Sequence, residues 1–222
     1  MNAIRDIMRA SPVMPVIVLE RVADAVPLAE ALVSGGIRVL EVTMRTPAAL
    51  DCVRAIRAAV PDAIVGAGTI CSLADLQAAR EAGAAFGVSP GATSSLLAGA
   101  TASNFPFLPG VMTPSDVLHA LAAGFSAMKL FPAKQAGGID MLKAMGGPFP
   151  QVLFCPTGGI DAESAVQYLA LANVVCVGGS WLAPADLVAQ KNWPEIERRA
   201  RQAAKLALNR AAAAAMHGKA EK

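Results

Sequence analysis

The sequence has few of the residues that build metal centres and disulfide frameworks. Its two histidines are His119 and His217. Its four cysteines are spread along the chain with no Cys-x-x-Cys pair: Cys52, Cys71, Cys155 and Cys176. Structural zinc sites and disulfide scaffolds need such residues at set, close spacings. We therefore predict free, reduced thiols and neither a metal site nor a cofactor that these residues would hold.

Charged residues are also scarce. They make up 16% of the 222 residues, the formal net charge is +2, and no cluster of Lys and Arg with interleaved aromatics appears. Nucleic-acid-binding domains carry a strongly basic face, and disordered chains combine high charge with few apolar residues. Apolar residues reach 55% here. The composition predicts a globular protein whose partner is a small molecule and not a nucleic acid.

Long apolar runs are missing too. No charged residue stands between Glu81 and Asp116, but Ser-Pro-Gly at 89–91 and Pro-Gly at 109–110 interrupt this segment. A helix needs about 20 predominantly apolar residues to cross a bilayer. The N-terminus has no apolar secretory core with a cleavage site. We expect no membrane segment and a cytoplasmic location.

What the sequence does contain is a repeated unit of a short apolar strand, a polar or glycine-rich loop and a helix rich in Ala and Leu. Strands are predicted to begin near Met14, Val39, Ala63, Phe86, Phe105, Ser126, Val152 and Val174. Helices are predicted near 22–34, 47–60, 72–82, 93–103, 114–123, 138–146 and 161–172. Eight units of about 23 residues favour an α/β protein with parallel strands, and a closed (β/α)8 barrel over an open sheet.

The ends of the chain extend this pattern within one domain, 1–222, since no linker or change of composition divides it. An amphipathic helix is predicted within residues 1–12, before the first strand. A long eighth helix is predicted to begin near Pro184 or Trp193, and residues 210–222 are predicted to be a frayed tail.

Lys129 stands in the middle of a short apolar segment, residues 126–132, which the spacing predicts to be a buried strand. Removing an ammonium group from water is costly, so its presence there needs an explanation. One interpretation is a desolvated lysine whose neutral amine attacks a carbonyl carbon. The alternatives are a structural lysine in an ion pair and an edge-strand lysine whose ammonium reaches solvent.

Glu41, Thr43 and Arg45 alternate along the second predicted strand, so they share one face of it. If this face points into the barrel, a carboxylate and a guanidinium lie near the C-terminal ends of the strands, where the chemistry of such barrels takes place. A local Glu41–Arg45 salt bridge is the structural alternative.

Glycine-rich segments follow the seventh and eighth predicted strands: Thr157-Gly158-Gly159 and Gly178-Gly179-Ser180. Backbone N–H groups and a helix N-terminus at these two positions of a barrel can bind a phosphate group. Glycines at the ends of the third and fourth strands, in Gly66-Ala67-Gly68-Thr69 and Ser89-Pro90-Gly91, permit a close approach of a ligand or simply make turns.

Six motifs in this order closely resemble the bacterial 2-keto-3-deoxy-6-phosphogluconate aldolases, also known as 2-keto-4-hydroxyglutarate aldolases. They are Glu41-Val42-Thr43-Met44-Arg45-Thr46, Gly66-Ala67-Gly68-Thr69, Ser89-Pro90-Gly91, Lys129-Leu130-Phe131-Pro132-Ala133, Phe154-Cys155-Pro156-Thr157-Gly158-Gly159 and Gly178-Gly179-Ser180-Trp181. The resemblance implies a (β/α)8 barrel, a homotrimer, and a lysine Schiff base that works without metal. The expected reaction is cleavage of the phosphorylated keto acid into pyruvate and glyceraldehyde 3-phosphate.

The resemblance also implies roles for individual residues. Lys129 would form the Schiff base and Glu41 would be the acid/base. Arg45 and Thr69 would hold the pyruvyl end of the substrate, which Pro90 would line. The distal phosphate would be bound by Thr157, Gly158, Gly159, Gly179 and Ser180.

Three local features refine the resemblance. Arg45 and Thr157 favour this family over the related galactonate aldolases. Where many family members have an acidic residue after Phe-Pro-Ala, this chain has Lys134-Gln135.

Two other interpretations remain open. A phosphosugar isomerase or decarboxylase on the same barrel would use Glu41 and Lys129 as acid and base without a covalent step. A non-catalytic phosphosugar-binding protein would keep the glycine loops, but would gain little from a buried lysine.

Overall fold

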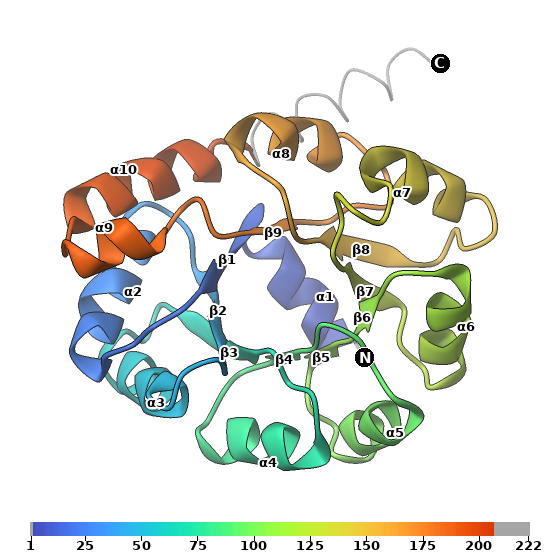
Figure 1. The fold of residues 1–222 in the computed structure, drawn as a ribbon, viewed down its shortest axis with the longest axis horizontal. Helices are drawn as coiled ribbons and strands as arrows, with labels where there is room; N and C mark the ends of the chain where they lie inside the picture. Colours follow the sequence, from blue (N-terminus) through green and yellow to red (C-terminus); the bar gives the residue numbers. More distant parts are fainter. Residues whose placement is uncertain (1, 207–222) are drawn as a thin grey trace.

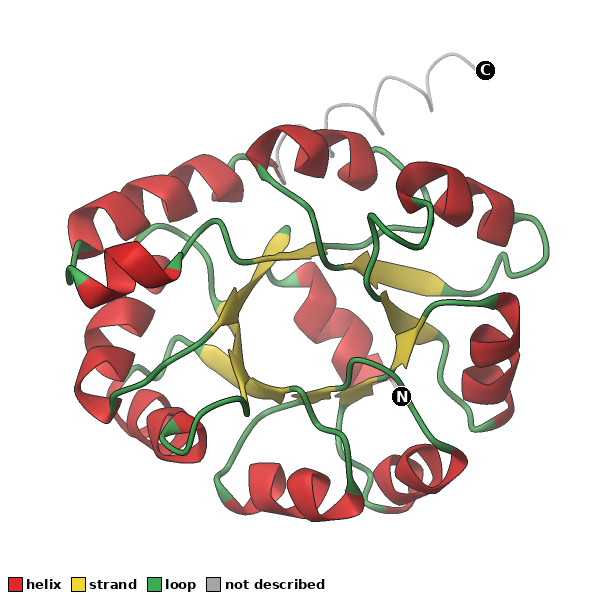
Figure 2. Ribbon diagram, in the orientation of Figure 1, coloured by secondary structure: helices red, strands yellow, loops and turns green. Residues whose placement is uncertain are grey.

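The computed structural model describes residues 2–206 as an α/β fold in which every paired strand is parallel. Hydrogen bonds join six strands in the order β5-β4-β3-β2-β1-β9 and three more in the order β6-β7-β8. Figure 2 shows these strands curled around a common centre, with one helix visible in the middle and the other helices outside the strands. The strands are β1 (Val13–Ile17), β2 (Val39–Thr43), β3 (Ile64–Gly68), β4 (Gly87–Val88), β5 (Phe107–Leu108), β6 (Gly110–Val111), β7 (Ala127–Leu130), β8 (Leu153–Pro156) and β9 (Val177–Gly179).

The helices between the strands lie close to the ranges expected from the sequence. They are α1 (Asn2–Arg9), α2 (Ala25–Ser34) after a 3-10 turn (Val22–Asp24), α3 (Ala49–Ala59), α4 (Leu73–Glu81), α5 (Ser94–Ala102), α6 (Pro114–Ala122), α7 (Gly138–Gly146) and α8 (Ala162–Leu169). The long eighth helix begins at Trp193, the second of its two expected starts: it is α10 (Trp193–Ala204), and a separate short helix, α9 (Ala185–Ala189), follows Pro184. Lys191, between them, has a φ of +53°, which ends a helix. The tail expected at 210–222 lies outside the described residues.

Side-chain caps define where several of these helices begin. The Ser72 hydroxyl accepts a hydrogen bond from the backbone N–H of Asp75 at the start of α4. Capping boxes, in which two residues satisfy each other's backbone donors, precede α6 (Thr113 with Asp116) and α8 (Asp161 with Ser164). The boundaries of these helices are therefore set by local sequence, which is why the repeated pattern predicted them well.

The strands separate two apolar clusters. Leu40 and Val42 on β2 point to the outer cluster, which fills the space between strands and helices. Val39, the first residue of β2, belongs to a smaller inner cluster together with Phe86 and Met14. Since alternate residues of a strand face opposite sides, Glu41 and Thr43 share the inner face with Val39. The inner apolar cluster thus occupies the N-terminal part of β2, and the polar side chains begin further along it.

The N-terminal helix α1 lies across the end of this inner cluster and is visible in the middle of the curled strands in Figure 1. Its Ile4 and Met8 side chains are buried in the cluster. Arg5 fixes the helix in place, because its Nη2 donates to the Ser126 hydroxyl (2.7 Å) and to the Gln151 carbonyl (3.2 Å). This end of the fold is therefore closed by apolar packing. Among the described residues, no helix is both long and apolar enough to span a bilayer.

Candidate active site

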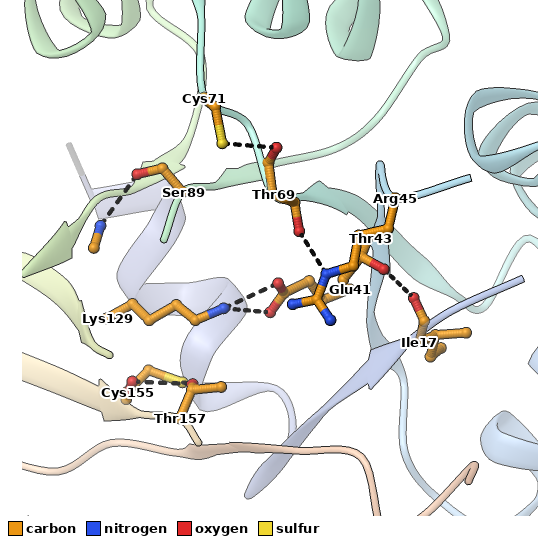
Figure 3. Close-up of polar contacts among 11 residues, drawn as sticks. Ile17, Glu41, Thr43, Arg45, Thr69, Cys71, Ser89, Lys129, Cys155 and Thr157 are labelled. Carbon is orange, nitrogen blue, oxygen red and sulfur yellow. Dashed lines mark hydrogen bonds and ion pairs between the residues drawn. The ribbon is translucent and has the colours of Figure 1, made fainter. Parts of the chain in front are cut away.

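Lys129 and Glu41 meet inside the fold although 88 residues separate them in the chain. Lys129 lies on β7, where it pairs with Gly110 of β6 and Cys155 of β8, and Glu41 lies on β2. The Lys129 Nζ donates to both carboxylate oxygens of Glu41, at 3.0 and 3.3 Å. Figure 3 shows the lysine side chain extending across toward the carboxylate. The lysine is 5% exposed and the glutamate 1%, so water is largely excluded from this pair.

Space for the carboxylate comes from β3. A Cβ atom added to Gly68 would collide with Glu41 Oε1 and Cγ, so only glycine fits beside this side chain. Thr43, two residues along β2, donates from its hydroxyl to the Ile17 carbonyl at 2.8 Å and is fully buried. The sequence suggested that Gly68 allowed a turn or a ligand, whereas the structure shows that it makes room for Glu41.

The pair can do chemistry that neither side chain could do alone. A buried ammonium–carboxylate contact becomes a neutral amine and a carboxylic acid when one proton moves over a single hydrogen bond, and such a transfer costs less where water is absent. The ring of Phe131 lies 5.3 Å from Nζ and adds favourable contact with the cationic form. The sequence-based alternative of an ion-paired lysine is thus correct for this state of the protein and remains compatible with a nucleophilic role.

Arg45 and Thr69 lie together on the other side of Glu41 (Figure 3). Arg45 Nε donates to Thr69 Oγ1 at 3.4 Å, and the arginine side chain is exposed. No hydrogen bond or ion pair joins Arg45 to Glu41 in the described part of the chain, so the expected alternative of a local salt bridge is not observed. The guanidinium group is therefore available to an anion entering from solvent.

Thr69 has an unusual backbone conformation. Its φ is +61°, in a region that a β-branched residue rarely adopts. Strain of this kind persists only where the surroundings impose it, and it is concentrated at functional sites. It was not foreseen from the sequence, because a Gly-x-Gly-Thr segment suggests that the glycines take the unusual conformation.

Pro90 is held close to β6. The Ser89 hydroxyl is fully buried and accepts a hydrogen bond from the backbone N–H of Gly110 at 3.1 Å. The backbone of Pro90 occupies the place where a side chain on Gly110 would be, so these two segments touch directly. Gly110 also pairs with Lys129. Ser89 and Gly110 were not among the predicted site residues, yet they fix Pro90 next to the strand that carries the lysine.

The two glycine loops lie side by side. A parallel bridge joins Thr157 to Gly178, so the residues that follow each of them, Gly158-Gly159 and Gly179-Ser180, leave the strands together. Gly158 and Gly159 have φ values of +106° and +73°, which side chains disfavour. The helix N-terminus expected nearby is already capped, since Asp161 accepts the backbone N–H of Ser164 at 2.8 Å.

Hydrogen bonding and burial shift the pKa of two side chains, one next to these loops and one elsewhere in the fold. The backbone N–H and the hydroxyl of Ser164 hold the pKa of Asp161 below its usual range, so its carboxylate stays ionised. Behind β2, burial raises the pKa of the Cys52 thiol from 9.0 to about 11, with smaller contributions from Asp51 and Asp24. Within residues 2–206 the four cysteines are thiols and form no disulfide, as predicted, and Cys71 is the exposed one. Across residues 2–206, no group of three or more possible metal-binding side chains occurs.

A cavity of about 510 Å³ lies at the opposite end of the fold, between α1, the end of α5 and the segments before β5 and β7. Its lining includes Ile4, Phe105 and Phe125 and has no titratable side chain. It therefore offers no side chain for acid–base chemistry, and the candidate active site is the region around Lys129.

Comparisons with known proteins converge on one family. The family model described as "KDPG and KHG aldolase" matches residues 4–199. The "KHG/KDPG aldolase" of Escherichia coli (strain K12) is 49% identical over 89% of this chain and 92% of that protein.

Two solved structures are similar in both sequence and fold. One is the KDPG aldolase of Legionella pneumophila, with pyruvate captured as a covalent carbinolamine intermediate. It has a TM-score of 0.88 and 46% identity, covering 89% of this chain and 96% of that one. The other is the 2-keto-3-deoxy-6-phosphogluconate aldolase of Zymomonas mobilis ZM4 with 3-phosphoglycerate. It has a TM-score of 0.88 and 47% identity, covering 93% of this chain and 97% of that one.

Proposed function

Because this chain belongs to the KDPG and KHG aldolase family, we propose that it is a class I aldolase acting through a Schiff base on Lys129. Its substrate is 2-keto-3-deoxy-6-phosphogluconate, cleaved to pyruvate and glyceraldehyde 3-phosphate, and it also acts on 2-keto-4-hydroxyglutarate. The observation that carries the proposal is the contact of Lys129 Nζ with both carboxylate oxygens of Glu41 in a nearly water-free interior. This contact places the nucleophilic amine of Lys129 next to a carboxylate that can accept its proton.

The first stage joins the substrate to the enzyme. Lys129 passes a proton to Glu41, and the neutral amine attacks the C2 ketone to give a carbinolamine. Glu41 then returns the proton to the C2 hydroxyl, which leaves as water, and an iminium forms between C2 and Nζ. Each transfer needs one acid/base group in contact with the nitrogen and the oxygen, and Glu41 has two oxygens within 3.3 Å of Nζ.

The second stage breaks the C3–C4 bond. Glu41, directly or through a water molecule, takes the proton of the C4 hydroxyl as C4 becomes the aldehyde carbon. The electron pair of the C3–C4 bond moves into the iminium and gives an enamine. Protonation at C3 restores the iminium, and its hydrolysis releases pyruvate and the free lysine.

Arg45 and Thr69 bind the carboxylate of the pyruvyl end in this proposal. A guanidinium group offers two parallel N–H donors to a carboxylate, and the exposed Arg45 is free to make this contact. The hydrogen bond from Arg45 to Thr69 fixes its orientation, and Pro90 lines the same end of the substrate. Thr157, Gly158, Gly159, Gly179 and Ser180 bind the distal phosphate, mainly through backbone N–H groups.

We further propose that the strands form a complete (β/α)8 barrel in one domain. Bridges from Phe154 to Val174 and from Thr157 to Gly178 support closure between β8 and β9. Pro109 alone separates β5 of the first sheet from β6 of the second, which supports continuity between the two sheets. The Pro109 carbonyl accepts the backbone N–H of Lys129 on β7 at 2.9 Å.

A homotrimer in the cytoplasm completes the proposal. Its support is the exposure of Leu73, Met112 and Leu118 on the side formed by α4, α5 and α6, at 49%, 42% and 56%. Light scattering should give a mass three times that of the chain. A monomer at micromolar concentration would contradict the assembly but not the chemistry.

Reduction of the imine tests the central step. Incubation with pyruvate and borohydride should fix pyruvate on the enzyme as a secondary amine, and peptide mapping should place the added mass on Lys129. Lys129→Arg should abolish both the label and cleavage, because a guanidinium stays protonated and cannot attack. Lys143→Arg, on the exposed face of α7, is the matched control and should keep both.

The competing functions give a different result in the same experiment. An isomerase, a decarboxylase or a phosphosugar-binding protein forms no imine, so each predicts no adduct on Lys129. Absence of the label under conditions where pyruvate protects the enzyme from heat would reject the aldolase assignment.

A further inference from the structure

The segment after β7 lies directly on the first glycine loop. Ala133 donates its backbone N–H to the Thr157 carbonyl at 2.8 Å, and Lys134 donates to the Gly158 carbonyl at 3.1 Å. A Cβ atom added to Gly159 would lie 2.7 Å from Lys134 Cβ and 2.9 Å from its Cδ. The aliphatic part of Lys134 therefore covers the α-carbon of Gly159, and its ammonium group is carried at the rim of this loop.

The charge of Lys134 is not neutralised by the protein. Within residues 2–206, several surface cations have acidic partners, as in Arg54 with Asp51 and Arg198 with Glu195, but no ion pair involves Lys134. The residue is exposed, so its ammonium group is hydrated and mobile at its end while its stem is held on the loop. A cation in this position is free to interact with an anion that enters from solvent.

The glycine loops themselves have no side-chain charge. Gly158, Gly159, Gly179 and Ser180 can offer backbone N–H groups and one hydroxyl, and these bind an anionic oxygen whatever group carries it. A phosphate monoester carries close to two negative charges at neutral pH, so a nearby ammonium favours it over a hydroxyl group at the same position. The lysine thus favours substrates with a charged distal group, at a site whose backbone donors do not distinguish between anions by their charge.

We propose that Lys134 is a specificity-determining residue that directs this enzyme toward substrates with a phosphate at the distal end. The inference rests on the proposed function, since it assigns the distal end of the same substrate. It is distinct from a purely structural role, in which only the aliphatic stem matters as a cover for Gly159.

The test separates charge from packing. Lys134→Met keeps an unbranched apolar stem and removes the charge, and Lys134→Arg keeps the charge. For Lys134→Met we expect kcat/KM on 2-keto-3-deoxy-6-phosphogluconate to fall about twofold to fivefold, the usual size for a solvent-screened charge contact. The unphosphorylated 2-keto-3-deoxygluconate should be cleaved with unchanged kcat/KM. Lys134→Arg should retain the preference of the parent enzyme.

Salt and a second lysine provide the controls. Added salt should weaken the parent enzyme's preference for the phosphorylated substrate and affect Lys134→Met less, because ions screen the charge that the variant lacks. Lys143→Met removes an exposed lysine near the N-terminal end of β8, at the other end of the strands, and should leave the preference as it is.

Equal losses on both substrates, or no loss on either, would overturn the role of Lys134. Such a result leaves the aldolase assignment intact as long as borohydride still fixes pyruvate on Lys129 in the same variant. Loss of trapping in the parent enzyme itself would instead reject the proposed function.

Discussion

The two ends of the proposed site are built in different ways. At the end proposed for the pyruvyl group, the strands hold the charged side chains of Lys129 and Glu41 away from water, at 5% and 1% exposure. The distal end depends on backbone, where Gly158 and Gly159 adopt positive φ values and Ser180 is exposed. The Lys129–Glu41 pair is buried and tied to the core, whereas Arg45 and the glycine loops face solvent.

This difference suits the two tasks that we propose for the site, which are the reaction at one end and the binding of an anion at the other. A carbonyl that must form and hydrolyse an imine needs proton transfers at fixed distances, which a rigid, dry pair of side chains provides. A distal anion needs attraction and room, which loops with backbone donors provide at lower structural cost. We therefore expect substitutions at the pyruvyl end to affect turnover on every substrate, and substitutions at the distal end to discriminate among substrates.

The largest effect is expected for Glu41→Gln. The amide keeps the shape of the side chain but cannot accept and return protons, so kcat should fall by about 10²–10⁴ on both phosphorylated and unphosphorylated substrates. Steady-state kinetics with each substrate measures this loss. Glu30→Gln on the exposed face of α2 removes a carboxylate elsewhere and should have no effect. Normal turnover by Glu41→Gln would assign the proton transfers to another group.

A second comparison concerns stability. Lys129→Met leaves the Glu41 carboxylate buried and unpaired, which should lower the free energy of unfolding by about 3–5 kcal/mol. In the double variant Lys129→Met/Glu41→Leu both charges are gone, and most of this loss should be recovered. Urea unfolding of the parent, Lys129→Met, Glu41→Leu and the double variant gives the coupling energy between the two side chains. Additive losses would mean that the pair is not coupled in the folded protein.

At the distal end, Ser180→Asp should act on one substrate only. The new carboxylate faces the phosphate, so kcat/KM for the phosphorylated substrate should fall about tenfold to a hundredfold. 2-Keto-4-hydroxyglutarate, which has no phosphate, should lose much less. Ser180→Ala is the matched control, because it removes the hydroxyl without adding charge and should cost less. Equal losses on both substrates would make this loop a structural element.

The residues proposed for the pyruvyl end stand out in the sequence more clearly than those proposed for the distal end, for a physical reason. A lysine within an apolar strand and a glutamate at alternating spacing are costly features that stand out, and the structure places them in contact. The family resemblance read from six short motifs is confirmed by the relatives and structures that match nearly the whole chain. Parallel strands and capped helices were also predictable, since local patterns set them.

Tertiary contacts between distant segments were not predictable. Gly68 is required by the carboxylate of Glu41, and Gly110 by the backbone of Pro90, yet each glycine reads as a turn in the sequence. The positive φ of Thr69 and the break between α9 and α10 depend on neighbours that a single sequence does not identify. The sequence identifies Lys134 as a departure from the family pattern, but the contact of its stem with Gly159 depends on the fold.

The smallest expected effect concerns the exposed capping box behind the first glycine loop. Hydrogen bonds from the backbone N–H and the hydroxyl of Ser164 lower the pKa of Asp161 below its ordinary value of 3.8. The folded state therefore favours the carboxylate, so this stabilisation is complete above pH 3.8 and is lost as the pH falls through the lower folded-state pKa.

Asp161→Asn keeps a capping acceptor but does not titrate. At neutral pH the two proteins should differ little in urea midpoint. Below about pH 4 the parent should lose stability faster than the variant, because only the parent loses its cap on protonation. The Lys129 adduct with pyruvate, formed at the buried end, should be the same in both. Parallel loss of stability in parent and variant would mean that this cap does not hold the loop.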